Sequence, residues 1–148
     1  MVDIQEYANR VYKSLGPGFN ECVYHNAMEV LLRKNNISYE TERIVPILFE
    51  GHTIGNLRAD IIIDGQIVVE LKAVKALTDT MTCQAKNYLK LLHLRQAYLV
   101  NFPQQSLPLG ADLEAEVKHI VLEQEEGEAV SIGSVICDNN LRDPSSLQ

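Results

Sequence analysis

The chain has 148 residues, of which 46% are hydrophobic and 22% are charged. This length suits one domain with a core of its own, and the composition is ordinary for a soluble globular protein. No apolar run approaches the roughly 18–20 residues that a membrane span needs. The polar, acidic N-terminus lacks the basic and apolar regions of a secretory signal. We therefore expect an intracellular protein that is neither secreted nor bound to a membrane.

The three cysteines support the same compartment. Cys22, Cys83 and Cys137 lie far apart in the sequence and are odd in number. This pattern predicts neither a disulfide framework nor a zinc site. A reducing, intracellular setting such as the cytoplasm fits it best.

The formal charge of −7 is confined to the end of the chain. Residues 1–109 hold 11 basic and 11 acidic residues, whereas residues 110–148 hold 2 basic and 9 acidic residues. We therefore predict a core domain over residues 1–109 and an acidic, partly disordered C-terminal extension over residues 110–148. The lack of a strongly basic face argues mildly against tight nonspecific binding to DNA.

Two helices are predicted at the N-terminus. Apolar residues recur at helical spacing over residues 3–14 and again over residues 20–35. A breaker cluster, Leu-Gly-Pro-Gly over residues 15–18, separates the two helices. Asn20 is a suitable N-cap for the second helix, which is expected to end at Asn35.

Three strands follow, over residues 38–49, 52–63 and 66–74. Glu50 and Gly51 form the first predicted turn, and the Asp-Gly pair at 64–65 is a strong hairpin signal. The runs Ile-Ile-Ile and Ile-Val-Val beside that turn are apolar on both faces, which favours a sheet covered on both sides.

The remaining elements are a helix over residues 79–93, a buried strand over residues 96–102, and a less regular end. Residues 111–123 are expected to form an acidic helix, residues 129–137 a strand, and the last ten residues no fixed structure. The fold class is therefore mixed α/β: a central mixed sheet flanked by helices, in the order α-α-β-β-β-α-β, with an additional C-terminal segment.

Charged residues interrupt the apolar hairpin over residues 52–74. Glu70 and Lys72 share a face because side chains alternate along a strand. A two-residue loop would place Asp60 on the opposite face from Glu70. A three-residue loop, with Gly65 in a left-handed conformation, would place Asp60 and Glu70 together. A metal ion shared by the two carboxylates needs the three-residue loop.

Two carboxylates and an ammonium group at one strand end suit phosphoryl chemistry. Carboxylate oxygens are hard ligands for Mg²⁺ or Mn²⁺. Such an ion activates water, and Lys72 is placed to orient that water or to stabilise developing charge. Glu-x-Lys on a strand is otherwise usually a solvated edge pair. The apolar surroundings favour the functional interpretation, because burying unpaired charge is costly.

These residues resemble the PD-(D/E)xK nuclease superfamily. Asp60, nine further residues and then Glu-Leu-Lys at 70–72 are similar to its signature, although Ala59 replaces the proline. Residues 18–24, GFNECVY, resemble the pattern of the GxxExxY family within that superfamily. Residues 84–88, QAKNY, resemble a Gln-x-x-x-Tyr motif, and the Asn-Phe pair at 101–102 is also similar to the group. The resemblance covers roughly residues 3–103 and implies a restriction-endonuclease-like core.

The resemblance also implies a role for each site residue. Asp60 and Glu70 would bind Mg²⁺, with Mn²⁺ as a substitute, and Glu21 would be a third acidic ligand. Lys72 would serve catalysis, and Gln84 would place the water or the nucleic acid backbone. Two further residues are expected at the substrate: Arg58 at a phosphate, and Tyr88 at the nucleic acid or as a brace. Alternatively, Glu21 and Gln84 are surface residues and Tyr88 belongs to the core.

The leading expectation is a metal-dependent hydrolase that cleaves phosphodiester bonds of DNA, with RNA as a second substrate class. The alternative is a nuclease-fold module with weak or no turnover that acts in binding or assembly. The acidic extension would then occupy the site, mimic nucleic acid or recruit a basic protein partner. A structural protein whose charges only resemble a site is a third interpretation. Nucleic acid and a second copy of the chain, as a homodimer, are the expected partners.

Overall fold

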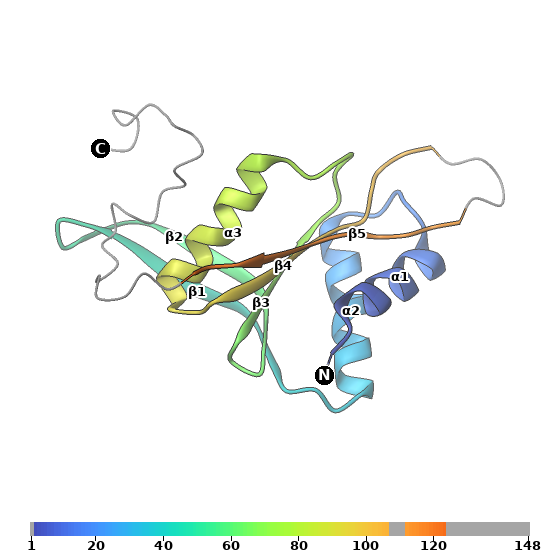
Figure 1. Cartoon of the computed structure of the whole chain (residues 1–148), viewed down its shortest axis with the longest axis horizontal. Helices are drawn as coiled ribbons and strands as arrows, with labels where there is room; N and C mark the ends of the chain where they lie inside the picture. Colours follow the sequence, from blue (N-terminus) through green and yellow to red (C-terminus); the bar gives the residue numbers. More distant parts are fainter. Residues whose placement is uncertain (1, 107–111, 124–148) are drawn as a thin grey trace.

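The computed structural model describes residues 2–106 and 112–123. Figure 1 shows a twisted sheet with helices on either side of it. The elements in chain order are α1 (Ile4–Leu15), α2 (Glu21–Lys34), β1 (Tyr39–Phe49), β2 (His52–Ile63), β3 (Ile67–Lys72), α3 (Asp79–Leu92), β4 (Gln96–Asn101) and β5 (Glu116–Val121). The predicted order α-α-β-β-β-α-β is confirmed, and β5 follows it.

Each helix begins at a residue whose side chain caps the free amide groups of the first turn. Asp3, Asn20 and Thr78 accept hydrogen bonds from the backbone amides three residues later. Such caps stabilise a helix by about 1 kcal/mol and fix the residue at which it begins. The cap predicted at Asn20 is therefore confirmed, and it sets the position of Glu21, the first residue of α2.

The five strands form one mixed sheet in the order β1-β2-β3-β4-β5. The pairs β1–β2, β2–β3 and β4–β5 are antiparallel, whereas β3 and β4 are parallel. The parallel pair requires a crossover, which α3 provides. The only parallel step in the described sheet thus places α3 directly after the strand that carries Glu70 and Lys72.

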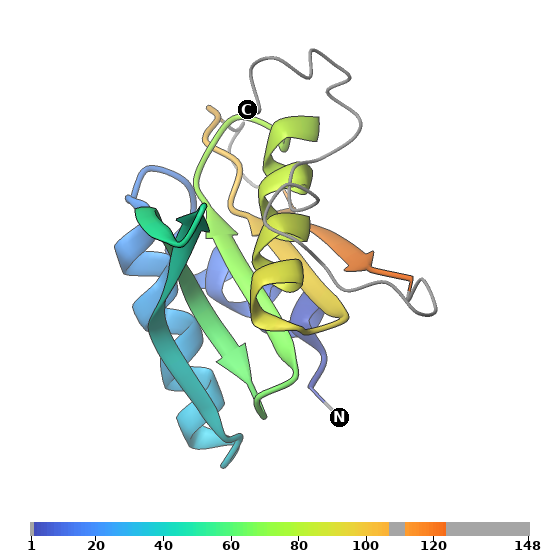
Figure 2. The same ribbon diagram turned by 90° about the vertical axis from the view of Figure 1, so that its left-hand side faces the viewer.

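Both faces of the central strands are buried, as the apolar runs predict. Ile61, Ile63 and Val69 pack with residues of α1 and α2 in one cluster. Ile62 and Val68 pack with residues of α3 in a second cluster. Figure 2 shows α3 on one side of the sheet and α1 and α2 on the other. The described part of the chain has a three-layer arrangement in which the middle of the sheet, including Ile61–Ile63 and Val68–Leu71, is buried.

The acidic helix expected over residues 111–123 is wrong, because this segment contains strand β5. Its backbone pairs with β4 along the whole strand, from Gln96 opposite Val121 to Asn101 opposite Glu116. Without β5, the outer edge of β4 would leave a row of hydrogen-bonding groups unpaired. The hydrogen bonds gained by pairing with β4 therefore decide the conformation of this segment, despite the helical spacing of its residues. The sheet consequently extends past the domain boundary predicted at residue 109.

Other expectations for the C-terminus concern residues outside the described ranges. The strand predicted over residues 129–137 and the unstructured last ten residues both lie there. Within the part of the chain that is described, no helix is both long and apolar enough to cross a membrane.

Two isoleucines on β2 test the assignment of the core. Ile61 is fully buried, whereas Ile54 is 65% exposed. We expect Ile61→Ala to lower the free energy of unfolding by about 2–5 kcal/mol, because it removes buried methyl groups and leaves a cavity. Ile54→Ala should change the free energy of unfolding by less than about 0.5 kcal/mol. Urea unfolding of both variants measures the difference, and equal effects would contradict the described packing.

Candidate functional site

The β2–β3 hairpin turn fixes the relative position of the two central acids. Ile63 pairs with Ile67, so the connection has three residues, Asp64 to Gln66. The amide of Gln66 donates to the carbonyl of Ile63 at 2.9 Å. Asp64 and Gly65 have φ angles of 52° and 65°, so both residues are left-handed, not Gly65 alone. The predicted three-residue loop is confirmed, and its register sets Asp60 opposite Glu70.

The carboxylates of Asp60 and Glu70 replace backbone pairing where β2 and β3 separate. The regular ladder ends at the pair Ile61 and Val69. Beyond it, the amide of Asp60 donates to Oε1 of Glu70 at 3.2 Å. In the opposite direction, the amide of Leu71 donates to Oδ2 of Asp60 at 2.8 Å. The two acids therefore meet in the gap between the strands, and each keeps one oxygen outside these two bonds.

The strand geometry is irregular at this same point. Ala59 and Ile62 both pack in the α3-side cluster, so the alternation of faces is interrupted between them. The facing residue on β1 is Glu42, because its neighbours pair with Ala59 and Ile61 on either side. Glu42 has a φ of 54°, an unfavourable conformation for a residue other than glycine. Such strain is typical of functional sites, and here it accompanies the turn of Asp60 out of the regular sheet.

Burial raises the pKa of both hairpin acids. Burial raises the pKa of Glu70 well above its ordinary value, and the charge of Asp60 raises it further. Burial also raises the pKa of Asp60, although the amide of Leu71 lowers it. The ammonium group of Lys72 lowers the pKa of both carboxyls. Asp60, Glu70 and Lys72 thus form one electrostatically coupled group, as the sequence predicts.

Glu21 reaches the same group from the first turn of α2. Its Oε2 accepts a hydrogen bond of 3.4 Å from the amide of Ala73, just beyond the end of β3. Its charge raises the pKa of both Asp60 and Glu70. The structure therefore places Glu21 beside the two hairpin acids, as expected for a third acidic member of the site.

A buried tyrosine holds the loop that delivers Glu21. Tyr24 is fully buried and stacks on Phe102, with ring centroids 4.4 Å apart. Its hydroxyl donates to the carbonyl of Gly16 at 2.7 Å and accepts from the amide of Phe19 at 3.3 Å. The tyrosine of the 18–24 motif therefore has a structural role, since it fixes the turn that precedes α2.

Tyr88 and Arg58 lie at the same site, whereas Gln84 is not shown to contact it. Burial raises the pKa of Tyr88 to about 12, and the charge of Glu70 contributes to this shift. Its aromatic ring also packs against the α3-side cluster, as the core interpretation expects. Its role as a brace or at the nucleic acid stays a prediction. The guanidinium of Arg58 lies 3.9 Å from a carboxylate oxygen of Glu42 in an exposed pair. Gln84 is an exposed residue of α3, and its role stays a prediction.

Asn101 fixes the loop that leaves Lys72. The side chain is fully buried at the end of β4, opposite Lys72 in the parallel pair. Its Oδ1 accepts from the amide of Val74 at 2.9 Å, and its Nδ2 donates to the carbonyl of Val74 and to Glu116. Every polar atom of this amide thus has a partner, which accounts for its burial. The Asn-Phe pair of the sequence motif therefore supports the site without belonging to it.

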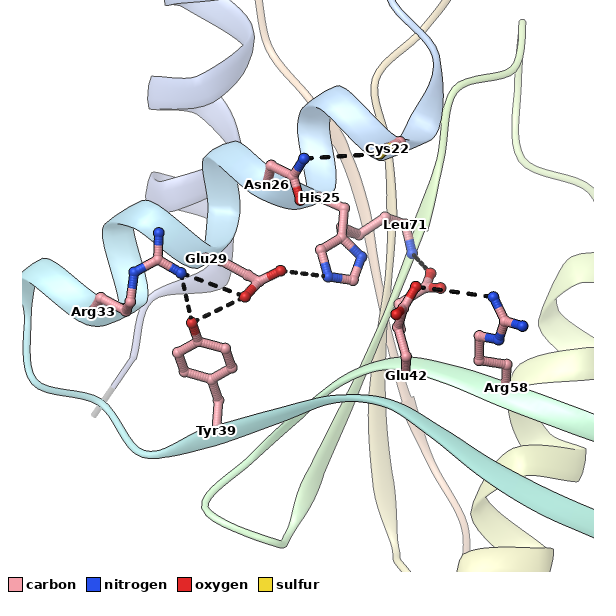
Figure 3. Close-up of polar contacts among 10 residues, drawn as sticks. Cys22, His25, Asn26, Glu29, Arg33, Tyr39, Glu42, Arg58 and Leu71 are labelled. Atoms are coloured by element: carbon pink, nitrogen blue, oxygen red, sulfur yellow. Dashed lines mark hydrogen bonds and ion pairs between the residues drawn. The ribbon is translucent and has the colours of Figure 1, made fainter.

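A pocket of about 200 Å³ opens between α2 and the hairpin, lined in part by Asp60 and Leu71. Sequence reasoning missed His25 and Glu29, which also line it. The Nε2 of His25 lies 2.9 Å from a carboxylate oxygen of Glu29 (Figure 3). The missed signal is spacing, because Glu21, His25 and Glu29 follow each other at four-residue intervals on one helix face.

The donor chemistry of the site fits a divalent cation. Asp60, Glu70 and Glu21 are hard oxygen donors. Burial raises the pKa of Asp60 and Glu70, and the charge of Glu21 raises both further. A bound cation would relieve this repulsion. Among the described residues, however, no three acidic, histidine or cysteine side chains are already arranged to hold one ion. Joint binding by these three carboxylates therefore requires side-chain rotation from the positions described.

Comparison with known proteins gives one family and one fold. A family model described as the PD-(D/E)XK nuclease superfamily matches residues 1–111. No curated protein matches the sequence significantly. The crystal structure of SSO0001 is similar, with a TM-score of 0.52 and 22% sequence identity. The alignment covers 78% of this chain and 54% of that one, so this chain spans about half the length of SSO0001. At this identity the likeness concerns the fold alone.

The raised pKa of Glu70 predicts a stabilising substitution. The pKa of Glu70 is higher in the folded protein than in the unfolded chain, so protonation of Glu70 favours the folded state. This contribution to stability is fully present below the pKa of the unfolded chain. It is lost as the pH rises through the pKa of the folded protein. At pH 7 without divalent metal, Glu70→Gln should therefore raise the free energy of unfolding by about 1 kcal/mol or more, since each pKa unit is worth about 1.4 kcal/mol.

The pH dependence distinguishes this effect from a change in packing. The gain of Glu70→Gln should shrink when unfolding is measured below the ordinary glutamate pKa of about 4.3. Added Mn²⁺ should stabilise the wild type more than the variant, because only the wild type keeps the carboxylate. A variant less stable than wild type at pH 7 would contradict the described electrostatics.

Proposed function

This chain belongs to the PD-(D/E)XK nuclease superfamily, and from that membership we propose that it is a metal-dependent nuclease acting on DNA, with RNA as the alternative substrate. The observation that carries the proposal is the meeting of Asp60 and Glu70, with Lys72 electrostatically coupled to them, where β2 and β3 separate. The motif over residues 18–24 further supports placement in the GxxExxY family.

Asp60, Glu70 and Glu21 would hold the cation, Mg²⁺ or Mn²⁺. When bound, such an ion lowers the pKa of a water molecule and stabilises charge on a phosphoryl oxygen. Asp60 and Glu70 supply the oxygens not used in their backbone hydrogen bonds. Those backbone bonds keep both side chains at the split between β2 and β3, and a rotation of side chains would still be needed to bring all three acids to one ion.

Lys72 would stabilise the negative charge that develops on the phosphate during attack by water. Lys72 lowers the pKa of both Asp60 and Glu70, so its ammonium group lies close enough to act on charge in the site. A fixed ammonium group in a partly dry site is worth far more than one in water, because the effective dielectric constant is lower. Asn101 keeps Lys72 in place through the loop after β3.

Arg58, Tyr88 and Gln84 would contact the nucleic acid around the reacting phosphate. The exposed guanidinium of Arg58 is held only by a long ion pair to Glu42, so it is free to exchange that partner for a phosphate. Tyr88 lies next to Glu70, and Gln84 lies one helical turn before Tyr88 on α3. We also propose that the chain forms a homodimer that binds both strands of the nucleic acid. The acidic extension would bind a basic protein partner.

A second candidate function is binding or assembly without turnover. One observation favours it, because among the described residues the acids are not already gathered around a common ion position. A nuclease-fold module of this kind would bind nucleic acid without cleaving it. Cleavage and binding assays on the same protein therefore separate the two functions.

A cleavage assay with Lys72→Ala tests the proposal. We expect the full chain to cleave a plasmid or a labelled oligonucleotide with Mg²⁺ or Mn²⁺ and not with EDTA. Lys72→Ala should lower the rate by at least about 100-fold, the usual loss when a charge-stabilising group is removed. Lys86→Ala, on α3, is the matched control and should cleave at the wild-type rate.

Two outcomes would contradict the nuclease proposal. Equal rates for wild type and Lys72→Ala would remove the mechanism. Binding of DNA by the wild type without cleavage under any divalent metal would favour the binding module instead.

A further inference from the structure

One face of α2 carries a row of three ionisable side chains toward the hairpin. Glu21, His25 and Glu29 are spaced four residues apart and all line the same pocket. Asp60 lines this pocket from β2, and the charge of His25 lowers the pKa of Asp60. His25 therefore lies beside the acids of the proposed site without belonging to their hydrogen-bond network.

Glu29 holds the imidazole ring of His25 in a fixed orientation. Its Oε2 lies 2.9 Å from Nε2 of His25, and the two side chains are only 19% and 13% exposed. Its other oxygen, Oε1, accepts from the hydroxyl of Tyr39 at 3.0 Å and from the guanidinium of Arg33 at 3.4 Å. Arg33 also donates to that hydroxyl at 2.9 Å. Figure 3 shows this network on the α2 side of the pocket.

The contact with Glu29 determines which ring nitrogen of His25 carries the hydrogen and which keeps a lone pair. A carboxylate only accepts hydrogen bonds when ionised, so Nε2 must carry the hydrogen in the bond to Glu29. In the neutral ring, Nδ1 then keeps its lone pair and is able to accept a proton. Glu42 lines the same pocket from β1.

We propose that His25 accepts the proton of the attacking water and that Glu29 is its positioning residue. The inference rests on the proposed nuclease function and deepens it. An O–H bond of the water breaks and its proton moves to Nδ1 of His25, while the water oxygen forms a bond to phosphorus. The bond from phosphorus to the leaving oxygen breaks, and its electron pair stays on that oxygen, which takes a proton from solvent. His25 then returns its proton to solvent.

This arrangement follows the logic of a base oriented by a carboxylate, which recurs on unrelated folds. It gives Lys72 and His25 separate tasks, charge stabilisation and proton transfer. The hairpin acids would hold the cation and Lys72 would stabilise charge, so the proton of the water is assigned to His25, which lines the same pocket as Asp60.

Chemical rescue tests the role of His25. The variant His25→Ala removes the imidazole ring. The matched control is His52→Ala, because His52 is the exposed first residue of β2. We expect His25→Ala to lower kcat by about 100-fold or more with little change in KM, as removal of a general base does. Added imidazole should restore part of kcat in His25→Ala and none in Lys72→Ala.

Nitrogen-15 NMR of the histidine rings tests the role of Glu29 without any activity. In the wild type, neutral His25 should carry its hydrogen on Nε2. Glu29→Gln keeps an oxygen acceptor and should keep this tautomer and most of kcat, whereas Glu29→Leu removes the acceptor and should lower kcat. If Glu29→Leu does not fold, the tautomer of the wild type and the kcat of Glu29→Gln still decide the question.

The outcomes separate this inference from the proposed function. If the wild type cleaves and Lys72→Ala does not, but His25→Ala cleaves like His52→Ala, then only the inference on His25 is overturned. A loss of kcat in folded His25→Ala that imidazole does not rescue also overturns it, as does a wild-type hydrogen on Nδ1. If the wild type cleaves nothing with any divalent metal, both proposals fail together.

Discussion

Two hydrogen bonds between side chains and backbone hold the site together, one from the amide of Asp60 to Glu70 and one from the amide of Leu71 to Asp60. They lie where β2 and β3 stop pairing, so each carboxylate satisfies a backbone amide that would otherwise be left without a partner. This constraint depends on the three-residue turn after Ile63, because a register shifted by one residue would separate the two acids.

The rest of the fold supports this gap between two strands. Burying carboxylates with raised pKa values costs stability, and the apolar layers on both faces of the sheet offset that cost. Two polar anchors then position the approaching segments. Tyr24 fixes the turn before Glu21, and Asn101 fixes the loop after Lys72. The strained backbone of Glu42 and the buried carboxyl groups are maintained by the surrounding structure, and both features are typical of functional sites.

Local patterns predicted most of the fold. Apolar periodicity located the helices and strands, and the Asp-Gly pair with the need for a shared site led to the correct loop length. The same reasoning failed at β5, because the local spacing of residues 111–123 cannot show that the edge of β4 needs a pairing strand. It also passed over His25 and Glu29, whose partners Tyr39 and Arg33 come together only in the folded chain. The interrupted alternation of faces at Asp60 could not be predicted either, because a sequence pattern for a strand implies strict alternation along β2.

We expect one divalent cation to bind acids from α2, β2 and β3 where β2 and β3 separate. A crystal of the full chain soaked in Mn²⁺, with anomalous diffraction data, provides the critical test. An anomalous peak at bonding distance, about 2.1 Å, from oxygens of both Asp60 and Glu70, with Glu21 turned toward it, is the expected result. A saturated soak without a peak between those two carboxylates, or with the ion held only by other residues, would exclude this metal site.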